Sequence, residues 1–487
     1  MTKLIIADID GLQPAQVCRE LAPNIYSVAE RGTVFENHHP VFPSVTRINA
    51  ASMVTGMLPG LHGLAANSFV ARDYDGTRVI SALKTEMASI AETGLRVLNA
   101  TTLQEILRPY DMQYIALGVG TSGNAYAHNP LAETCGGATI HPEFTIPAIL
   151  ENNIKNRFGE WPPELLPNLP RYEHAMNIFL EYVLGEISPE IALIWSSEPD
   201  KSQHMHGVGD EHSNYALKQS DEQFGRLLRF MDSNSMDVDT NLMIVSDHGY
   251  STIIDNVDLE NELKAAGFII GGETGQVLVA PNGGCALLYV GGSDLDSSER
   301  ISEWIMSQSW CGTVLVSERV GKIEGTLPLN LVGCEGPRSP DIVVSFRWTS
   351  EQNDNGYPGY VYSTGGSAGQ GQHGSMSRYE MNNTLICAGP NFRSGERLLS
   401  PTGNIDVMPT ALDLLGIPVP DNISGRILKE GYPQYNESIV ASSETHISSR
   451  TLEVDGKEST YTQKIEISKV GSSLYLDEGN GHRDSDL

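Results

Sequence analysis

The stretch that decides the fold is Leu4-Ile5-Ile6-Ala7-Asp8-Ile9-Asp10-Gly11, close to the start of the chain. Residues 4–9 are largely apolar and do not alternate with polar ones, which is typical of a central parallel strand buried on both faces. In open α/β sheets, functional side chains lie at the carboxyl ends of such strands. We therefore predict a buried first strand that presents Asp10 at the edge of a sheet.

The same pattern returns further along the chain. Apolar runs that resemble buried strands occur at residues 114–118, 191–195 and 242–245. Helical patterns fall between the strands, at residues 14–31, 103–107, 174–184 and 213–231. Strands that alternate with helices predict an α/β fold with a doubly wound, mainly parallel sheet flanked by helices.

The alternation of apolar strands and helices is interrupted between His248 and His373. Short strands at residues 277–280 and 286–290, a helix at 297–306 and Gly-rich loops predict an inserted lid subdomain over about residues 255–365. Runs at 341–345 and 384–387 are expected to return to the core sheet, followed by a helix at 405–415 that Gly416 ends. The predicted catalytic domain thus covers residues 1–436, and residues 437–487 are expected to add a small strand extension with a frayed, charged tail.

Composition excludes several classes of protein. The net charge of −29 argues against nucleic-acid binding, because an acidic surface repels phosphate backbones. No apolar run approaches the roughly 20 residues that span a bilayer, so no membrane partner is expected. The chain opens directly into its first apolar strand, which leaves no room for a signal peptide and predicts the cytoplasm. A homo-oligomer is compatible with the sequence.

Side chains suited to catalysis or metal binding recur at five separated places, each just past an apolar strand or in a Gly-rich turn. They are Asp10-Gly11, Pro43-Ser44-Val45-Thr46, Glu198-Pro199-Asp200 with His204, Ser246-Asp247-His248-Gly249 and Gln372-His373-Gly374. In a parallel sheet these strand ends converge on one crevice. Carboxylate and imidazole mixtures suit Zn²⁺ or similar divalent ions, and the groups outnumber what one tetrahedral site needs. Two metal ions in one crevice fit the count.

These motifs, in this order, resemble the alkaline phosphatase superfamily, and within it the type I phosphodiesterase / nucleotide pyrophosphatase and phosphonoacetate hydrolase families. The resemblance covers roughly residues 3–75, 190–250 and 370–428. It implies two divalent metal ions, Zn²⁺ in first place and Mn²⁺ or another ion as the alternative. By the resemblance one ion is held by Asp10, Asp247 and His248 with Thr46 as fourth ligand, and the other by Asp200, His204 and His373.

The resemblance also implies that Thr46 is the nucleophile and forms a phosphothreonine intermediate. A threonine hydroxyl is a poor nucleophile at neutral pH unless a metal or a base activates it, which the implied ligand set provides. Asn67 follows Thr46 by 21 residues, where these families place a phosphate-binding amide. Backbone N–H groups at a helix start after Thr46 would bind a further phosphoryl oxygen.

Each residue taken alone has a simpler interpretation. Asp10 suits a turn before glycine, Thr46 suits a helix N-cap, and an Asp200-x-x-x-His204 pair arises often by chance on a helix. His206 is interpreted as a solvated loop histidine, and Asp8, two residues deeper in its strand than Asp10, as structural. His38-His39 and the Gly-rich turn at 118–123 are assigned no chemistry. Together and in order, however, the five motifs are an implausible coincidence.

Arg47 is the residue that bears on the substrate. Nucleotide-cleaving relatives have an aromatic residue directly after the nucleophile, whereas a guanidinium here predicts a contact with a second phosphate or a carboxylate. The expected function is hydrolysis of small organic phosphodiesters or pyrophosphates. The alternatives are a phosphonate hydrolase that cleaves a C–P bond and, less favoured, a non-catalytic metal- or anion-binding scaffold. A sulfatase is disfavoured because Ser44-Val45-Thr46-Arg47 lacks that class's nucleophile signature.

Overall fold

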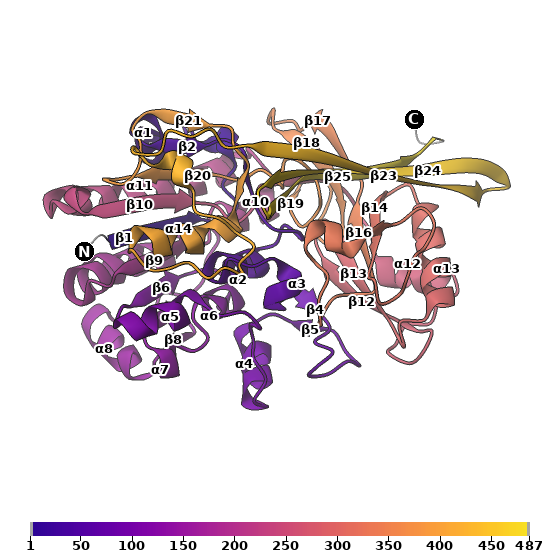
Figure 1. The fold of residues 1–487 in the computed structure, drawn as a ribbon, viewed down its shortest axis with the longest axis horizontal. Coiled ribbons are helices and arrows are strands. Elements are labelled where there is room, and N and C mark those ends of the chain that lie inside the picture. The colour runs from indigo at the N-terminus through magenta and orange to yellow at the C-terminus, as the bar shows by residue number, and fades with distance from the viewer. Residues whose placement is uncertain (1–2, 485–487) are drawn as a thin grey trace.

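A nine-stranded mixed sheet forms the core of the computed structural model, which describes residues 3–484 (Figure 1). In spatial order its strands are β21 (Glu396–Leu398), β2 (Thr33–Phe35), β20 (Leu385–Ala388), β10 (Thr240–Val245), β1 (Lys3–Ile9), β9 (Ile191–Ser196), β6 (Tyr114–Gly118), β7 (Ala138–His141) and β8 (Phe144–Ile146). The central strands β10, β1, β9, β6 and β7 run parallel, while β20 and β8 are antiparallel to their neighbours. The predicted α/β class with a mainly parallel sheet flanked by helices is confirmed, and β20 and β8 are the strands that make the sheet mixed.

Helices cover both faces of this sheet because its central strands are apolar on both sides. Within β1, Leu4 and Ile6 pack into one hydrophobic core, and Ile5 and Ala7 pack into the other. The first core is closed by α2 (Thr46–Thr55), α4 (Lys84–Glu92), α5 (Leu103–Leu107), α6 (Ser122–His128) and α14 (Val407–Leu414). The second is closed by α1 (Pro23–Arg31), α8 (Ile149–Phe158), α9 (Leu169–Ile178) and α11 (Glu211–Ser233).

The first predicted helix is shorter than expected. A 3₁₀ turn covers Pro14–Gln16, and the α-helix begins only at Pro23. Proline favours the first helical position, where its missing N–H is not needed, so Pro23 starts a new helix. The helix predicted at 174–184 likewise divides, into α9 and a π-helical segment at Phe179–Ile187.

A second sheet of five strands lies beside the core (Figure 1). Its strands, in spatial order, are β12 (Val277–Asn282), β13 (Cys285–Val290), β16 (Ile342–Phe346), β14 (Cys311–Val316) and β15 (Leu327–Pro328), and α12 (Leu259–Ala265) and α13 (Leu295–Met306) pack on it. The expectation that residues 341–345 return to the core sheet is wrong, because β16 pairs with β13 and β14 instead. An apolar run reports burial, and it cannot tell which of two sheets buries the strand.

A small four-stranded sheet connects these two parts. It contains β17 (Trp348–Gln352), β18 (Pro358–Ser363), β11 (Ser251–Asn256) and β19 (Gly371–Gln372). β11 begins two residues after the motif at residues 246–249, and β19 directly precedes His373. The antiparallel pairing of β11 with β19 therefore brings His373 back to the end of β10.

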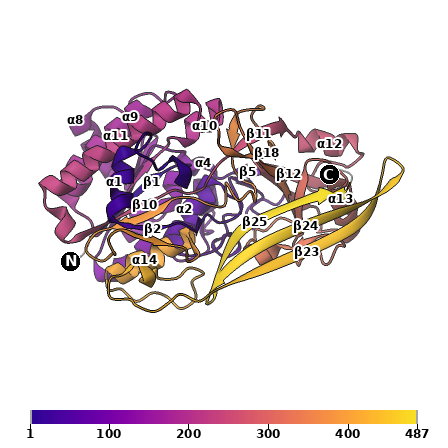
Figure 2. The same cartoon turned by 90° about the horizontal axis from the view of Figure 1, so that it is seen from above.

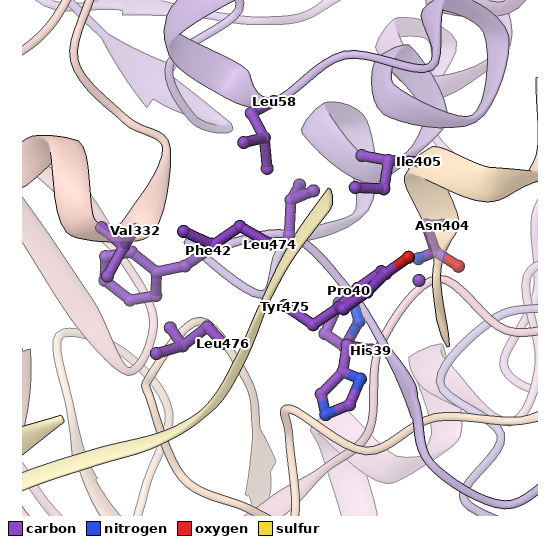
Figure 3. Close-up of a pocket in the computed structure, with 12 residues that line it drawn as sticks. His39, Pro40, Phe42, Leu58, Val332, Asn404, Ile405, Leu474, Tyr475 and Leu476 are labelled. Atoms are coloured by element: carbon purple, nitrogen blue, oxygen red, sulfur yellow. The ribbon is translucent and has the colours of Figure 1, made fainter. Parts of the chain in front are cut away.

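Three long antiparallel strands, β23 (Ala441–Val454), β24 (Lys457–Val470) and β25 (Ser473–Arg483), lie across the second sheet (Figure 2). The hydroxyl of Tyr461 donates to Gly312 O on β14. At the other end, β25 closes a small pocket between Phe42, Leu58 and Leu476 (Figure 3). The part of the predicted tail at 485–487 lies outside the described residues, and the predicted domain division stays a prediction. Within residues 3–484, no helix combines the length and apolar character needed to cross a bilayer.

Candidate active site

Three neighbouring parallel strands end at one place and supply the first group of site residues. Asp10 follows β1, Asp200 begins α10 (Asp200–His206) after β9, and Asp247 follows β10. Since β9 and β10 flank β1 in parallel, their carboxyl ends meet at the same edge of the sheet. The side chains therefore come together although nearly 240 residues of chain separate the first from the last.

Asp10, Asp247 and His248 form one buried cluster of metal-ligand type, with their ligand atoms within 4.8 Å of one another. Nε2 of His248 lies 3.6 Å from Oδ1 of Asp10 and 3.1 Å from Oδ2 of Asp247. Nδ1 of His248 is 3.0 Å from the carbonyl oxygen of Gly249. Because a carbonyl only accepts, Nδ1 carries the hydrogen and the lone pair of Nε2 faces the two carboxylates.

Asp200, His204 and His373 form the second cluster. Nε2 of His204 lies 3.1 Å from Nε2 of His373, and Oδ1 of Asp200 lies 3.4 and 3.5 Å from these two atoms. The two clusters adjoin, because the rings of His248 and His373 stack with their centroids 3.6 Å apart. The structure thus brings together all six histidines and aspartates to which the sequence assigned metal binding.

Thr46 lies beside the first cluster as the first residue of α2. Its Oγ1 is 3.3 Å from Nε2 of His248. The N-cap position is Val45, so the Thr46 hydroxyl is not used for capping and faces the cluster instead. The Arg47 N–H donates to Oδ1 of Asn67 at 3.1 Å, which places Asn67 at the start of α2 as well.

The site gathers several buried carboxylates, and the positive charge of nearby side chains does not balance their negative charge. Burial, and after it the charges of Asp247, Asp200 and Asp8, raise the pKa of Asp10 well above its ordinary value. Burial and the neighbouring His248 and His204 lower the pKa of His373 well below its ordinary value. Burial alone would lower the pKa of His248, yet the adjacent carboxylates raise it.

Three residues that hydrogen-bond to the predicted metal ligands were not predicted from the sequence. Trp195 Nε1 donates to Oδ2 of Asp10 at 3.0 Å, and the Tyr250 hydroxyl donates to Oδ1 of Asp200 at 2.9 Å. Asn404 Nδ2 donates to the Asp247 carbonyl at 2.8 Å. Each polar group stands at the end of an apolar run or next to a motif, which is the signal that could have identified it. The hydrogen-bond partner of each group lies so far away in the chain that sequence spacing cannot identify it.

Glu380 is a further supporting residue, and it is fully buried. Its carboxylate accepts from the backbone N–H of Ser375 at 2.6 Å, from the Ser375 hydroxyl at 2.7 Å and from the Ser44 hydroxyl at 3.2 Å. The carbonyl of Ser44 in turn accepts from Nδ1 of His373 at 2.7 Å. Glu380 therefore ties the loop that precedes Thr46 to the loop that carries His373.

The remaining residues lie apart from the two clusters. Asp8 is fully buried, and neither of its carboxylate oxygens has a hydrogen-bond partner among residues 3–484. His38, in β3 (His38–His39), contacts Thr402 and Asn404 and not the clusters. The turn at 118–123 does contribute, since Thr121 Oγ1 accepts from Nε of Arg47 at 3.3 Å.

Comparison with known proteins places this geometry among phosphodiesterases. The sequence profile of the family described as type I phosphodiesterase / nucleotide pyrophosphatase matches residues 4–375. An uncharacterised pyrophosphatase/phosphodiesterase of Schizosaccharomyces pombe is 23% identical over 260 residues, which is 52% of this chain and 46% of that protein. Ectonucleotide pyrophosphatase/phosphodiesterase family member 1 of Mus musculus is 26% identical over 234 residues, which is 47% of this chain and 22% of that protein.

The chain therefore spans less than half the length of these relatives. Among solved structures, murine ectonucleotide pyrophosphatase/phosphodiesterase 5, as an inactive variant in complex with AMP, superposes with a TM-score of 0.64. That match has 15% sequence identity and covers 89% of this chain and all of the murine one. The human protein of the same name gives a TM-score of 0.63 at 16% identity, covering 89% of this chain and all of its own. These similarities support the fold.

Proposed function

The chain belongs to the type I phosphodiesterase / nucleotide pyrophosphatase family, a family of hydrolases, and we propose that it cleaves small organic phosphodiesters or pyrophosphates with Thr46 as nucleophile. One observation carries the proposal. Thr46 Oγ1 lies 3.3 Å from Nε2 of His248, so the only hydroxyl on the first turn of α2 faces the first cluster. AMP in the murine neighbour is in keeping with a small nucleotide-like substrate.

The two clusters fit divalent cations. Oδ1 of Asp10 and Oδ2 of Asp247 are buried, and neither has a hydrogen-bond partner among residues 3–484. Nδ1 of His204 and Nδ1 of His373 each lie within hydrogen-bonding distance of a backbone carbonyl, so the lone pairs of their two Nε2 atoms face each other at 3.1 Å. Lone pairs and carboxylates that converge in this way repel one another unless a cation lies between them.

We expect one ion at Asp10, Asp247, His248 and Thr46, and one at Asp200, His204 and His373. Imidazole and carboxylate ligands favour Zn²⁺, with Mn²⁺ as the alternative. When bound, such ions lower the pKa of coordinated hydroxyls and stabilise charge on phosphoryl oxygens.

The chain's own residues then act as follows. Thr46 Oγ1 gives up its proton to solvent and attacks phosphorus, and a Thr46–O–P bond forms as the P–O bond to the leaving group breaks. The leaving oxygen departs with the electron pair of that bond and takes up a proton from solvent. Asn67 Oδ1 accepts from the Arg47 N–H, so the donor group of its amide, Nδ2, is the part that would donate to a phosphoryl oxygen. The N-terminus of α2 adds a helix dipole that favours the negative charge of the phosphoryl group. The oxygen of a water molecule then bonds to phosphorus, the Thr46–O–P bond breaks, and Thr46 Oγ1 takes up a proton from that water, which releases the phosphoryl product and restores the hydroxyl.

Arg47 indicates the kind of substrate. Its guanidinium is largely buried, donates to Asn67 O, Ser81 Oγ and Thr121 Oγ1, and forms no ion pair with a carboxylate of the described chain. Burial lowers the pKa of Arg47 only to about 10, so it stays charged at neutral pH. A buried cation without an anionic partner is costly, and a second phosphate or a carboxylate of the substrate would compensate it.

A comparison of substrates on zinc-loaded enzyme tests the proposal. The panel contains p-nitrophenyl thymidine monophosphate, bis-p-nitrophenyl phosphate, p-nitrophenyl phosphate and phosphonoacetate, each with wild type and Thr46→Ala. Turnover of the diesters that is lost in Thr46→Ala supports the proposal. Turnover of phosphonoacetate with little diester activity would move the chain to C–P hydrolysis, with Arg47 on the carboxylate. No turnover of any substrate would favour a non-catalytic scaffold.

The compartment predicted from the sequence stays a prediction, because two relatives are named as ectonucleotide enzymes.

A further inference from the structure

A third group of metal-ligand side chains lies outside the two catalytic clusters, at the turn between α10 and α11. It consists of His206, the last residue of α10, Asp210, which caps α11, and His212 in the first turn of α11. One ligand atom from each residue lies within 4.8 Å of the others. This cluster shares α10 with the catalytic site, which uses Asp200 and His204 from the same helix.

The turn that connects the two histidines is held in place. Gly207 and Gly209 both have positive φ, and a Cβ on Gly209 would come within 2.4 Å of the Tyr357 ring. Val208 is buried, and its carbonyl accepts from Nδ2 of Asn353 at 3.0 Å and of Asn355 at 3.1 Å. Because the backbone between the helices is fixed, the ligand side chains need little ordering to meet.

The side chains already face one another. The rings of His206 and His212 stack with their centroids 4.5 Å apart and their planes 20° apart. Nδ1 of His212 lies 3.0 Å from Oδ1 of Asp210, which also accepts from the His212 backbone N–H at 2.9 Å. The side chain of His212 is 61% exposed and that of Asp210 is 32% exposed, so ions reach the cluster from solvent.

We propose that His206, Asp210 and His212 bind a third divalent transition-metal ion, with Zn²⁺ as the first candidate. Two imidazoles and one carboxylate are the ligand set that Zn²⁺, Ni²⁺ or Cu²⁺ prefers, whereas Ca²⁺ and Mg²⁺ prefer oxygen ligands alone. Small side-chain rotations bring the three atoms to the roughly 2.0–2.2 Å that such ions require. The exposed side leaves the fourth position to water.

A bound ion joins the end of α10 to the start of α11. His204 and His206 lie on one helix, yet His204 contacts His373 and His206 contacts His212, so the third ion does not share a ligand with the catalytic pair. The ion therefore stabilises the helix that holds Asp200 and His204 without entering the crevice. The net charge of −29 also raises the local concentration of cations around the protein.

Metal uptake by the full-length chain tests this inference independently of any catalytic role. Metal-free protein is dialysed against buffered Zn²⁺, and bound zinc is counted by elemental analysis. We expect about three ions in wild type and about two in His212→Ala. Asp210→Asn is a second variant, expected to bind about two ions as well, since asparagine caps a helix as well as aspartate and so preserves the start of α11.

His446→Ala is the matched control, because His446 also lies beside an acid, Glu444, but is in no group of three ligand side chains among residues 3–484, and it should keep about three ions. Thr46→Ala should keep at least the third ion even if it is inactive. Equal zinc counts in wild type, His212→Ala and Asp210→Asn would overturn the inference, whatever the diester assays show. A rise in the melting temperature with Zn²⁺ that is smaller in both variants than in wild type would support it.

Discussion

The Nε2 atoms of His204 and His373 lie 3.1 Å apart although 169 residues of chain separate them. The Nδ1 atoms of both rings lie within hydrogen-bonding distance of backbone carbonyls, so the two Nε2 lone pairs point toward each other. Oδ1 of Asp200 lies 3.4–3.5 Å from the same two atoms. Three electron-rich atoms that converge in this way repel one another unless a cation lies between them, which supports the proposed metal site.

Replacing His373 with alanine should therefore remove one catalytic ion. We expect the zinc count of His373→Ala to fall by about one and diester turnover to fall by a factor of about 100 or more. The reason is that one of the two cations that stabilise the negative charge of the transition state is lost. His212→Ala provides the contrast, since it should lose one ion and keep its turnover. An unchanged zinc count in His373→Ala would contradict the ligand assignment.

Glu380→Gln should lower turnover without loss of fold. The carboxylate accepts from the Ser375 N–H and the Ser44 hydroxyl through Oε2, and from the Ser375 hydroxyl through Oε1. The glutamine amide has one acceptor oxygen and an NH₂ donor in place of the other, so at least one of these contacts is lost and the link between the loops that carry Thr46 and His373 is weakened. Misplacement of reacting groups by a fraction of an ångström to about 1 Å costs roughly 10- to 100-fold in rate, and we expect the loss in kcat rather than in KM. Glu430→Gln is the control, being a buried glutamate paired with Arg426 away from the clusters. Equal kcat values for the two variants would refute a positioning role.

Arg47→Ala should discriminate between substrates. We expect KM to rise about tenfold or more for an organic pyrophosphate or a carboxylated substrate and to change little for bis-p-nitrophenyl phosphate, which has no second anionic group. Arg47→Lys keeps the charge and should recover part of the loss. If KM rises equally for all substrates, Arg47 acts on the site as a whole and not on a second anion.

Buried His62 should make stability fall as the pH falls. Burial lowers the pKa of His62 from 6.5 to about 3, because its ring lies between Ser52 and the Leu64 N–H with no solvent contact. The unfolded chain binds a proton that the folded chain excludes, so the contribution is fully present above pH 6.5 and is lost as the pH falls toward 3. Between about pH 5.5 and 4, where the histidine of the unfolded chain is protonated and that of the folded chain is not, wild type should lose about 1.4 kcal/mol per pH unit more than His62→Asn. If the urea midpoints of the two proteins change equally with pH, His62 is not the source of this pH dependence of the free energy of unfolding.

Much of the fold could be predicted from the sequence because its central strands are apolar on both faces. Residues 4–9 identify β1, and the polar residues just past β1, β9 and β10 identify the side of the sheet at which they meet. Parallel pairing then brings Asp10, Asp200 and Asp247 together without further information. The division of the ligands into two clusters was implied by the resemblance to the alkaline phosphatase superfamily, because strand order alone does not assign a ligand to one ion or the other.

The parts that could not be predicted depend on partners far away in the chain. The run at 341–345 has the apolar character of a core strand, and only its pairing with β13 and β14 assigns it to the second sheet. Trp195 contacts Asp10 across 185 residues, and Glu380 contacts Ser44 across 336. His206 is exposed, as interpreted from the sequence, although it ends α10 and does not lie in a loop. Its stacking on His212 depends on the turn at 207–209 and could not be predicted from spacing.

The central claim is that Thr46 performs nucleophilic attack on a phosphodiester, and its most direct test is hydrolysis of p-nitrophenyl thymidine monophosphate by zinc-loaded wild type and Thr46→Ala. Release of p-nitrophenol is followed at equal zinc content, which is checked by elemental analysis. The proposal predicts turnover by wild type and a loss of at least about 1,000-fold in Thr46→Ala. Equal turnover by the two proteins would contradict it.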